Sequence, residues 1–394
     1  MSNPQLITVD VTLDGDLQLK IVWAKDGRQF MPYYIDRTMV EEYSEEIRTC
    51  LQSLLDRGMS SGLQGSGDLL KQLAQAGAKL YSSLFYPDGQ NNQIQPSTIQ
   101  NWLRAFQEPV QISFSVDNRV HVPWGLIYDA NADTLKGRTE DDAIDNYQSF
   151  WCLKYKLSSV YSKVSPMGVD VVRPADAFKM LSVVNKAVFE NAASNLGNSD
   201  WSAVCDWIFN NFGKPLYSSN EFFEKWKEIE EKIGLLFFYC HANGTSIALD
   251  VEDKFSVSEF KRQTVRRTTA QDQPACMVFI NGCNTAIGDP GGGFLEATGR
   301  AGFCGFIGTE TKVPDVFALR FGLAFLFYFL YEGLPVYEVM DRLRRQHWPL
   351  SLIYSTYCYP LLKVNPEPVK SRSPLSMQAR ENFSLLNPLG TSQM

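Results

Sequence analysis

From about residue 166 onward, apolar runs of strand length alternate with stretches of helical periodicity, and this alternation most constrains the fold. Strands separated by helices are typical of a parallel α/β sheet, because each crossover returns the chain to the same end of the sheet. Two of the runs, LLFFYC at 235–240 and CMVFIN at 276–281, are almost wholly apolar. Such runs indicate central strands that are buried on both faces. The sequence therefore predicts an α/β fold for its second half.

The other predicted elements follow from the same two periodicities. In the second half they are strands at 168–172 and 303–308 and helices at 176–193, 219–232, 256–267, 293–301, 314–332 and 335–346. In the first half they are alternating strand material at 6–23 with a turn at Gly15, helices at 40–57 and 68–85, a polar loop at 87–97, and strands at 110–116 and 120–128. The change of pattern predicts two parts, 1–165 and 166–363, and a loosely ordered tail at 364–394 that is rich in Pro, Ser and Asn.

Charge and hydropathy exclude some classes of partner. The 394 residues carry a net charge of −7, which argues against nucleic-acid binding as the main role. The most apolar stretch, Phe321–Tyr331, is too short to span a bilayer, and this length favours a buried core helix. Met1–Asp10 lacks the charged-then-apolar pattern of a secretory leader. We therefore expect a soluble, cytoplasmic protein with neither a nucleic-acid nor a membrane partner.

Cysteine and histidine spacing gives no sign of a metal site. The eight cysteines are scattered without a CxxC pair, whereas zinc sites usually combine tight local pairs of ligands. The one adjacent pair, Cys240–His241, ends a strand, where consecutive side chains point to opposite faces. The GDPGGG segment at 288–293 lacks the lysine and Ser/Thr spacing of a P-loop. We therefore expect no metal, no cofactor and reduced cysteines, and a nucleotide-binding signalling domain ranks as the weakest alternative.

Polar, glycine-containing exits follow both central strands. His-Ala-Asn-Gly at 241–244 follows LLFFYC, and Gly282-Cys283 follows CMVFIN. The segment between them has room for one helical crossover, which predicts neighbouring parallel strands. Both exits then lie at one carboxyl edge of the sheet, where open α/β sheets bind ligands.

The residue types at this edge favour thiol chemistry. A free thiol has a pKa near ~8.5 and is mostly protonated at neutral pH, and an imidazole with a pKa near ~6.5 can accept its proton. We therefore expect Cys283 and His241 to act together. The backbone N–H groups of Cys283 and of the turn that begins at Ala242 are candidates to hold an oxyanion. Taken singly, a loop histidine and a buried cysteine are the plainer interpretations.

Longer patterns around these exits carry a resemblance. LLFFYCHANG, ACMVFINGCNTA and the segment from GGGFLEATGR to FLYEG resemble the CHAT family, caspase-like cysteine peptidases related to separase. Upstream, VHVPWGLIYD at 120–129 is similar to the family's PWELLYD element, so the resemblance covers about residues 30–363. It implies a caspase-like, mostly parallel sheet flanked by helices, preceded by a degenerate pseudo-protease half. It also implies His241 as general base and Cys283 as nucleophile.

The resemblance further implies a protein substrate and control by a protein activator or by cleavage, in a bacterial antiviral defence or cell-death pathway. The chain departs from the family at Ala242, where glycine is common directly after the histidine. This departure keeps open a second hypothesis, a catalytically silent interaction protein with the caspase shape.

Three acidic residues are candidates for a substrate pocket that selects Arg or Lys: Asp250, Glu310 and Asp315. The alternative is that they are surface or capping residues, and Asp315 follows Pro314 at a predicted helix start, where an acid is favoured. The basic stretch at 261–273 is interpreted as a solvated helix end, with an activation-cleavage loop as the sharper alternative.

Overall fold

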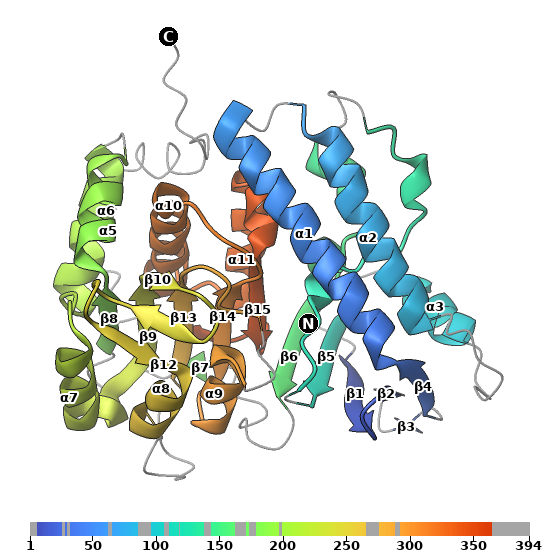
Figure 1. Ribbon diagram of the computed structural model, residues 1–394, viewed down its shortest axis with the longest axis horizontal. Helices are drawn as coiled ribbons and strands as arrows, with labels where there is room; N and C mark the ends of the chain where they lie inside the picture. The colour runs from blue at the N-terminus through green and yellow to red at the C-terminus, as the bar shows by residue number, and fades with distance from the viewer. Residues whose placement is uncertain are drawn as a thin grey trace. The chain divides into compact units, whose positions relative to one another are not determined.

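Figure 1 shows the computed structural model of the chain. It describes residues 6–25, 28–29, 32–61, 65–85, 96–105, 110–117, 119–137, 143–161, 171–172, 179–196, 199–264, 276–287 and 292–364. The predicted tail beyond residue 364, most of the loop at 87–97, residues 265–273 of the basic stretch and residues 288–291 of GDPGGG lie outside this part. The chain divides into two compact units, Met1–Lys163 and Val164–Met394.

The first unit contains a sheet of strand order β3-β2-β1-β5-β6, with β4 paired to β2. Its strands are β1 (Leu6–Asp14), β2 (Gln18–Lys25), β3 (Arg28–Gln29), β4 (Tyr33–Asp36), β5 (Gln111–Val116) and β6 (Lys156–Tyr161). Its helices are α1 (Arg37–Ser61), α2 (Gly67–Phe85), α3 (Pro96–Arg104) and α4 (Trp151–Lys154), with 3₁₀ turns η1 (Trp124–Leu126), η2 (Ala132–Thr134) and η3 (Ile144–Tyr147). The antiparallel β1–β2 hairpin turns at Gly15, whose φ is 71°, and β1, β5 and β6 run parallel.

Burial in this sheet alternates along the strands. Ile7, Val9 and Val11 of β1 are fully buried, and the residues between them are half-buried. The buried face carries an aromatic cluster in which Trp23 lies 5.6 Å from the ring of Phe85 on α2. Such alternation is typical of a sheet that packs its core on one face.

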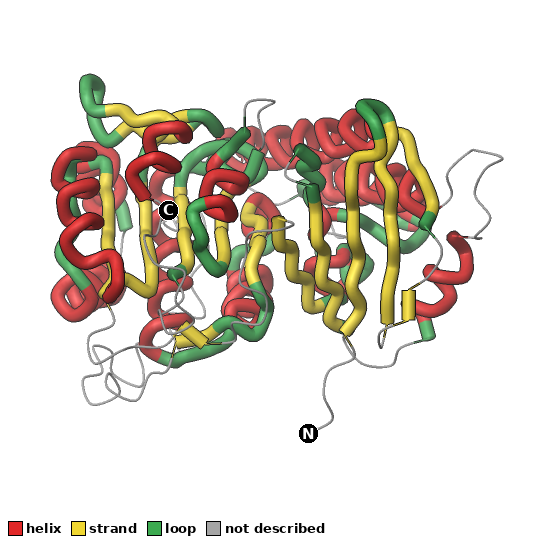
Figure 2. The backbone as a smooth tube through the Cα atoms, turned by 90° about the horizontal axis from the view of Figure 1, so that it is seen from below, coloured by secondary structure: helices red, strands yellow, loops and turns green. Residues whose placement is uncertain are grey.

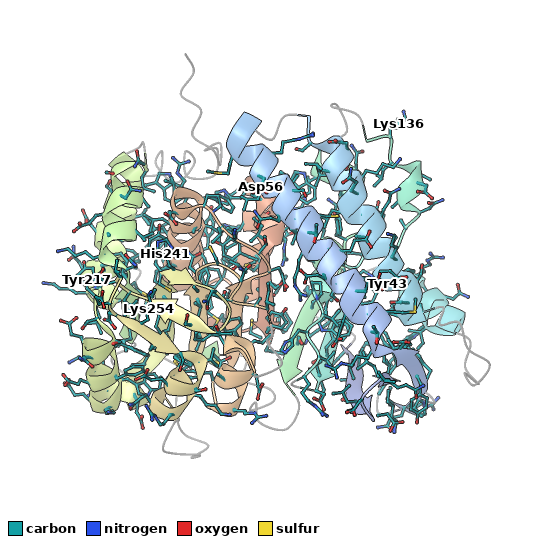
Figure 3. All side chains as sticks on the ribbon, in the orientation of Figure 1. Tyr43, Asp56, Lys136, Tyr217, His241 and Lys254 are labelled. Carbon is teal, nitrogen blue, oxygen red and sulfur yellow. The ribbon has the colours of Figure 1, made fainter. Side chains whose placement is uncertain are left out.

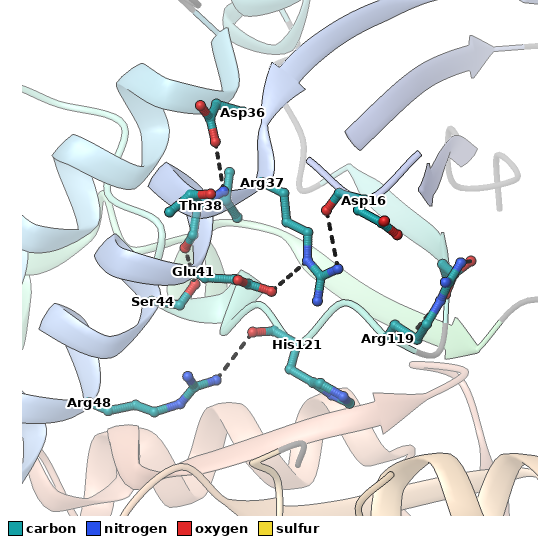
Figure 4. Close-up of polar contacts among 11 residues, drawn as sticks. Asp16, Asp36, Arg37, Thr38, Glu41, Ser44, Arg48, Arg119 and His121 are labelled. Atoms are coloured by element: carbon teal, nitrogen blue, oxygen red, sulfur yellow. Dashed lines mark hydrogen bonds and ion pairs between the residues drawn. The ribbon is translucent and has the colours of Figure 1, made fainter. Parts of the chain in front are cut away.

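The first turn of α1 is fixed by polar contacts (Figure 4). Asp36 Oδ1 accepts a hydrogen bond of 2.7 Å from the Thr38 N–H, which satisfies a backbone donor that the helix leaves unpaired. Arg37 donates to Glu41 one turn along the helix. Further along, Arg48 donates to the carbonyl oxygen of His121 at 3.3 Å, so α1 is tied to the loop after β5.

The predicted strand at 120–128 is wrong, because Trp124–Leu126 forms the 3₁₀ turn η1. Pro123 precedes the turn and has no N–H to contribute to a ladder. The Trp124 ring stacks on Phe114 at 4.2 Å, which places the indole in the core instead of on a strand face. Tyr128 keeps a single isolated bridge to Phe150.

The second unit contains a five-stranded sheet of order β15-β14-β13-β9-β8. The unit also contains a three-stranded sheet, β10-β11-β12, and a β7–β16 pair. The strands of the unit are β7 (Val171–Val172), β8 (Lys179–Val184), β9 (Ile233–Tyr239), β10 (His241–Ala242), β11 (Ser246–Ala248), β12 (Lys254–Ser256), β13 (Met277–Asn281), β14 (Gly305–Thr309), β15 (Tyr354–Cys358) and β16 (Lys363–Val364). Its helices are α5 (Lys186–Ser194), α6 (Ser199–Phe212), α7 (Ser219–Ile229), α8 (Val257–Thr264), α9 (Phe294–Arg300), α10 (Asp315–Leu326) and α11 (Val336–Gln346), with η4 (Glu230–Lys232), the π-helical η5 (Phe327–Tyr331) and η6 (Leu350–Ile353). Strands β8, β9, β13 and β14 are parallel, and β15 is antiparallel to β14.

Helices cover both faces of this sheet (Figures 1 and 2). Helices α5, α6 and α11 pack on α10, and α8 packs on α7 and α9. Phe279 of β13 meets Phe325 of α10 at 5.2 Å, while Phe238 of β9 meets Phe222 of α7 at 5.2 Å on the other face. Every residue of β9 is buried, which explains its unbroken apolar sequence. The predicted fold class, a mostly parallel α/β sheet flanked by helices, is confirmed.

The predicted helix at 176–193 is wrong in its first half, where Lys179–Val184 forms strand β8 and the helix begins only at Lys186. The run KMLSVV is a short apolar segment of strand length, and such a segment is ambiguous by periodicity alone. Asn185 separates the two elements, since its side chain accepts a hydrogen bond from the Val188 N–H and caps α5. Within the described residues, no helix is long and apolar enough to cross a bilayer.

Candidate active site

The two central strands are parallel neighbours, as the sequence predicts, and their register aligns their ends. Tyr239 of β9 pairs with Asn281 of β13, and paired residues on neighbouring strands lie roughly 4.8 Å apart. His241 and Cys283 each follow two residues after these partners. The structure therefore brings the two predicted residues to adjacent exits at one edge of the sheet.

The two exits lie against each other at Gly282. The Cys240 N–H donates to the Asn281 carbonyl at 3.4 Å, which continues the ladder by one bond. A Cβ at position 282 would lie 2.7 Å from the Cys240 carbonyl oxygen and 3.1 Å from Ala242 Cβ. Only glycine fits this approach, so residue 282 determines how closely the two exits meet.

The loop after the cysteine is anchored to the segment that follows β14. The N–H groups of Asn284, Thr285 and Ala286 donate to Thr311 O at 3.1 Å, Thr309 Oγ1 at 3.4 Å and Thr309 O at 2.9 Å. By contrast, the Cys283 N–H has no acceptor within the described part of the chain. Asn284 has a φ of 58°, in the left-handed region that asparagine tolerates better than most residues. The loop therefore holds its backbone rigidly and leaves one N–H available at the cysteine.

The Cys283 thiol is half-buried and donates to the carbonyl oxygen of Val313 at 3.9 Å. Burial raises the pKa of this thiol above its usual value, and the nearby Asp315 carboxylate raises it further. The Val313 backbone and the Lys312 ammonium lower the pKa but do not cancel the rise. In this conformation Cys283 is a protonated thiol at neutral pH.

His241 is exposed and begins β10, where it pairs with Ala248 of β11 (Figure 3). Its imidazole forms no hydrogen bond with any residue that the structure describes, and the thiol of Cys283 bonds to Val313 instead of to it. Ala242, the second predicted oxyanion donor, pairs with Ile247 of β11. Its backbone nitrogen lies close to Gly282, since a Cβ added at residue 282 would be 3.6 Å from it. His241 and Cys283 are thus on neighbouring exits without a direct hydrogen bond.

The three acidic candidates occupy different environments. Asp315 begins α10, is half-buried, and its charge acts on the Cys283 thiol. The carboxylate of Glu310 is fully buried and accepts a 2.8 Å hydrogen bond from the Tyr357 hydroxyl. Asp250 is exposed in the β11–β12 turn and accepts from the Val251 N–H. Among the three, the structure brings only Asp315 near the cysteine.

Sequence reasoning missed a set of buried polar residues beneath the site. Asn281 Nδ2 donates to Ala318 O of α10 at 2.6 Å, and Asn281 Oδ1 accepts from the Tyr354 hydroxyl at 2.7 Å. Thr285 and Thr309 are also fully buried and bond to each other. The sequence feature that could have indicated them is the polar residue that ends an apolar strand, Asn281 in β13 and Thr309 in β14. Among the described residues, no three His, Cys, Asp or Glu side chains form a group that could hold a metal ion.

No family model and no curated protein matches the chain. Among solved structures, separase in the Saccharomyces cerevisiae separase–securin complex aligns with a TM-score of 0.48 and 10% identity over 91% of this chain. The Arg-specific cysteine proteinase gingipain R aligns with a TM-score of 0.38 and 11% identity, covering 83% of this chain and 77% of that one. The chain spans 30% of the separase chain.

Proposed function

We propose that this chain is a cysteine endopeptidase in which Cys283 is the nucleophile and His241 the general base. One observation carries the proposal: the register of Tyr239 with Asn281 puts both residues at adjacent strand exits, beside the Cys283 N–H, which has no acceptor among the described residues. The resemblance of these exits to the CHAT family supports the same roles.

The reaction would proceed in two halves. His241 takes the thiol proton, and the Cys283 sulfur bonds to the peptide carbonyl carbon while the carbonyl electrons move onto oxygen. The N–H groups of Cys283 and Ala242 hold that oxyanion. The tetrahedral intermediate collapses and expels the amine, which His241 protonates. Water, deprotonated by His241, then attacks the thioester, releases the acid and regenerates the thiol.

The described conformation corresponds to a resting state of this enzyme. Burial raises the pKa of the Cys283 thiol, and the thiol bonds to the Val313 carbonyl instead of to His241, so the nucleophile is inactive in this state. Activation then requires the imidazole to turn toward the thiol. We assign this step to a protein activator or to cleavage of the chain, within a cytoplasmic bacterial defence or cell-death pathway.

Asp315 supplies a basis for substrate choice. A half-buried carboxylate beside the nucleophile would pair with an Arg or Lys side chain of the residue before the cut. We therefore propose cleavage after basic residues. Glu310 and Asp250 are not part of this pocket, because the Glu310 carboxylate accepts a hydrogen bond from Tyr357 and the Asp250 carboxylate accepts one within the β11–β12 turn.

Labelling with a peptide electrophile tests the enzyme proposal. The wild type, Cys283→Ala and His241→Ala are treated with a peptidyl acyloxymethyl ketone that ends in arginine, alone and with candidate activator proteins, and the modified residue is located by mass spectrometry. We expect label at Cys283 in the wild type and a loss of label of at least tenfold in His241→Ala. Labelling that is equal with and without His241 would contradict the assigned base.

One alternative has its own support, a catalytically silent protein that binds a regulator. The thiol with a raised pKa and the imidazole without a hydrogen bond to it both agree with an inactive site. A folded wild type that takes no label at Cys283 and cuts no candidate substrate with any activator would favour this alternative.

A further inference from the structure

The orientation of the peptide unit between Gly282 and Cys283 determines where the available N–H points. This unit is trans, since the only cis peptide among the described residues is Trp348–Pro349. In a planar trans peptide the C=O and the N–H point in opposite directions. Any group that holds the Gly282 carbonyl oxygen therefore also directs the Cys283 N–H.

That group is the hydroxyl of Thr309. Thr309 Oγ1 donates a hydrogen bond to the Gly282 carbonyl oxygen, and both atoms lie in the interior, because Thr309 is fully buried. The carbonyl thus points inward toward the end of β14. The N–H of Cys283 must then point outward, which agrees with its lack of an acceptor among the residues that the structure describes.

A second threonine fixes the direction of the Thr309 hydroxyl. The Thr309 N–H donates to Thr285 Oγ1 at 3.0 Å, and the Thr285 N–H donates to Thr309 Oγ1 at 3.4 Å. The Thr285 hydroxyl proton has its own acceptor, Ile280 O at 3.0 Å, with Gly282 O more distant at 3.4 Å. The Thr309 proton is left for Gly282, so the pair has one fully satisfied arrangement.

We propose that Thr309 is a positioning residue for catalysis, which aims the Cys283 N–H at the substrate oxyanion by holding the Gly282 carbonyl. The proposal rests on the proposed peptidase function. It assigns Thr309 no contact with the substrate. Loss of the Thr309 hydroxyl frees the Gly282–Cys283 peptide unit to rotate, and the Cys283 N–H is then no longer oriented to donate to the oxyanion.

Kinetics of two valine variants separate this role from a structural one. Thr309→Val is compared with Thr309→Ser, which keeps the hydroxyl, and with Thr298→Val, which removes a buried hydroxyl that donates to Leu295 O within α9. We expect Thr309→Val to lower kcat about 10- to 100-fold with little change in KM, below the full loss of an oxyanion donor. Thr309→Ser should restore kcat, and Thr298→Val should not lower it.

Two inhibitors that react with the same thiol sharpen the comparison. A peptide aldehyde forms a hemithioacetal whose oxygen needs the oxyanion donor, whereas iodoacetamide alkylates sulfur without creating an oxyanion. Thr309→Val should bind the aldehyde about 10- to 100-fold more weakly and react with iodoacetamide at the wild-type rate. Equal aldehyde affinity in both proteins, or a parallel loss of both reactions, would overturn the positioning role.

An NMR measurement needs no activity and so separates this inference from the proposed function. Protein labelled with ¹⁵N-cysteine gives amide signals, among which Cys283 is assigned by its absence in Cys283→Ala. Rotation of the peptide unit should move the Cys283 signal in Thr309→Val but not in Thr309→Ser. An unmoved signal refutes the inference even if the wild type is inactive. If Thr309→Val does not fold, Thr309→Ala replaces it in all three tests.

Discussion

Gly282 sits where two backbone segments leave no room for a side chain. A Cβ there would lie 2.7 Å from the Cys240 carbonyl oxygen, which belongs to the backbone and cannot move aside as a flexible side chain can. The neighbouring Ala242 Cβ would be 3.1 Å away, a contact that a small shift relieves. The strand exits therefore meet at this residue because it is glycine.

Gly282→Ala should destabilise the protein by roughly 1–3 kcal/mol, the usual cost of overpacking, and should separate the exits that carry His241 and Cys283. Urea unfolding followed by tryptophan fluorescence measures the loss. Adding Ala242→Gly removes the 3.1 Å contact but not the one with the Cys240 carbonyl, so it should restore only part of the stability. Full recovery in the double variant would mean that the side-chain contact is the dominant one.

Asp315 and Lys312 act on the Cys283 thiol with opposite signs. The thiolate is the reactive form, so a negative neighbour that disfavours it raises the pKa and slows alkylation at neutral pH. Asp315→Asn should therefore lower the pKa of Cys283, shift the rate profile to lower pH and speed alkylation several-fold at pH 7. Lys312→Gln should shift the profile the other way. The test is the rate at which iodoacetamide alkylates Cys283, measured by peptide mass spectrometry from pH 6 to 10. If both variants shift the pH–rate profile in the same direction, the opposite effects assigned to Asp315 and Lys312 are contradicted.

At the scale of single residues, the sequence predicts which residues are candidates for the site better than it predicts the contacts around them. His241 and Cys283 stand out because polar residues and glycines follow apolar runs, and the parallel register that brings them together agrees with that pattern. Their chemical roles stay a prediction. The hydrogen bond of Thr309 with Gly282 and the electrostatic effect of Asp315 on Cys283 join residues far apart in the chain, so no local pattern predicts them.

Among the elements, α10 is tied to the sheet by hydrogen bonds close to the candidate site. The Tyr239 hydroxyl donates to Asp315 O at 2.9 Å, and Asn281 Nδ2 donates to Ala318 O at 2.6 Å. The Tyr354 hydroxyl of β15 completes the chain of contacts by donating to Asn281 Oδ1 at 2.7 Å. These bonds fix the start of α10, and with it the Val313 carbonyl that accepts a hydrogen bond from the Cys283 thiol.

Tyr354→Phe should cost about 1–3 kcal/mol of unfolding free energy, because it leaves the buried Asn281 oxygen without a donor. Tyr217→Phe is the matched control, since Tyr217 is 41% exposed and loss of its hydroxyl leaves no buried polar group without a partner. Denaturant unfolding of both variants gives the difference. A Tyr354→Phe protein as stable as the control would show that the Asn281 oxygen finds another partner.

Element prediction from the sequence succeeds where length and periodicity agree and fails where they conflict. Strands β9 and β13 are unbroken apolar runs of strand length with a helix between them, and they are predicted to within two residues at each end. The segment at 176–193 joins a short apolar strand to a helix, and only the cap at Asn185 separates them. The turn at Trp124 depends on stacking with Phe114, a tertiary contact that overrides the local strand pattern.

At the scale of the whole chain, each unit buries its own core. In Met1–Lys163 the core lies on one face of the sheet, with Trp151, Phe85 and Phe114 among its rings. In Val164–Met394 it lies on both faces, around β9 and β13. Because each unit has its own buried core, we expect the two units to open in separate reactions.

Amide hydrogen exchange should therefore report the two units independently. Gly282→Ala weakens the second unit, so exchange should accelerate in β13 and stay at the wild-type rate in β1. Gly77→Ala is the reciprocal variant, since a Cβ at that position in α2 would collide with the Leu126 carbonyl oxygen, and it should accelerate β1 alone. Mass spectrometry of peptic peptides resolves both strands in one experiment. Faster exchange in both β1 and β13 in either variant would contradict independent opening of the two units.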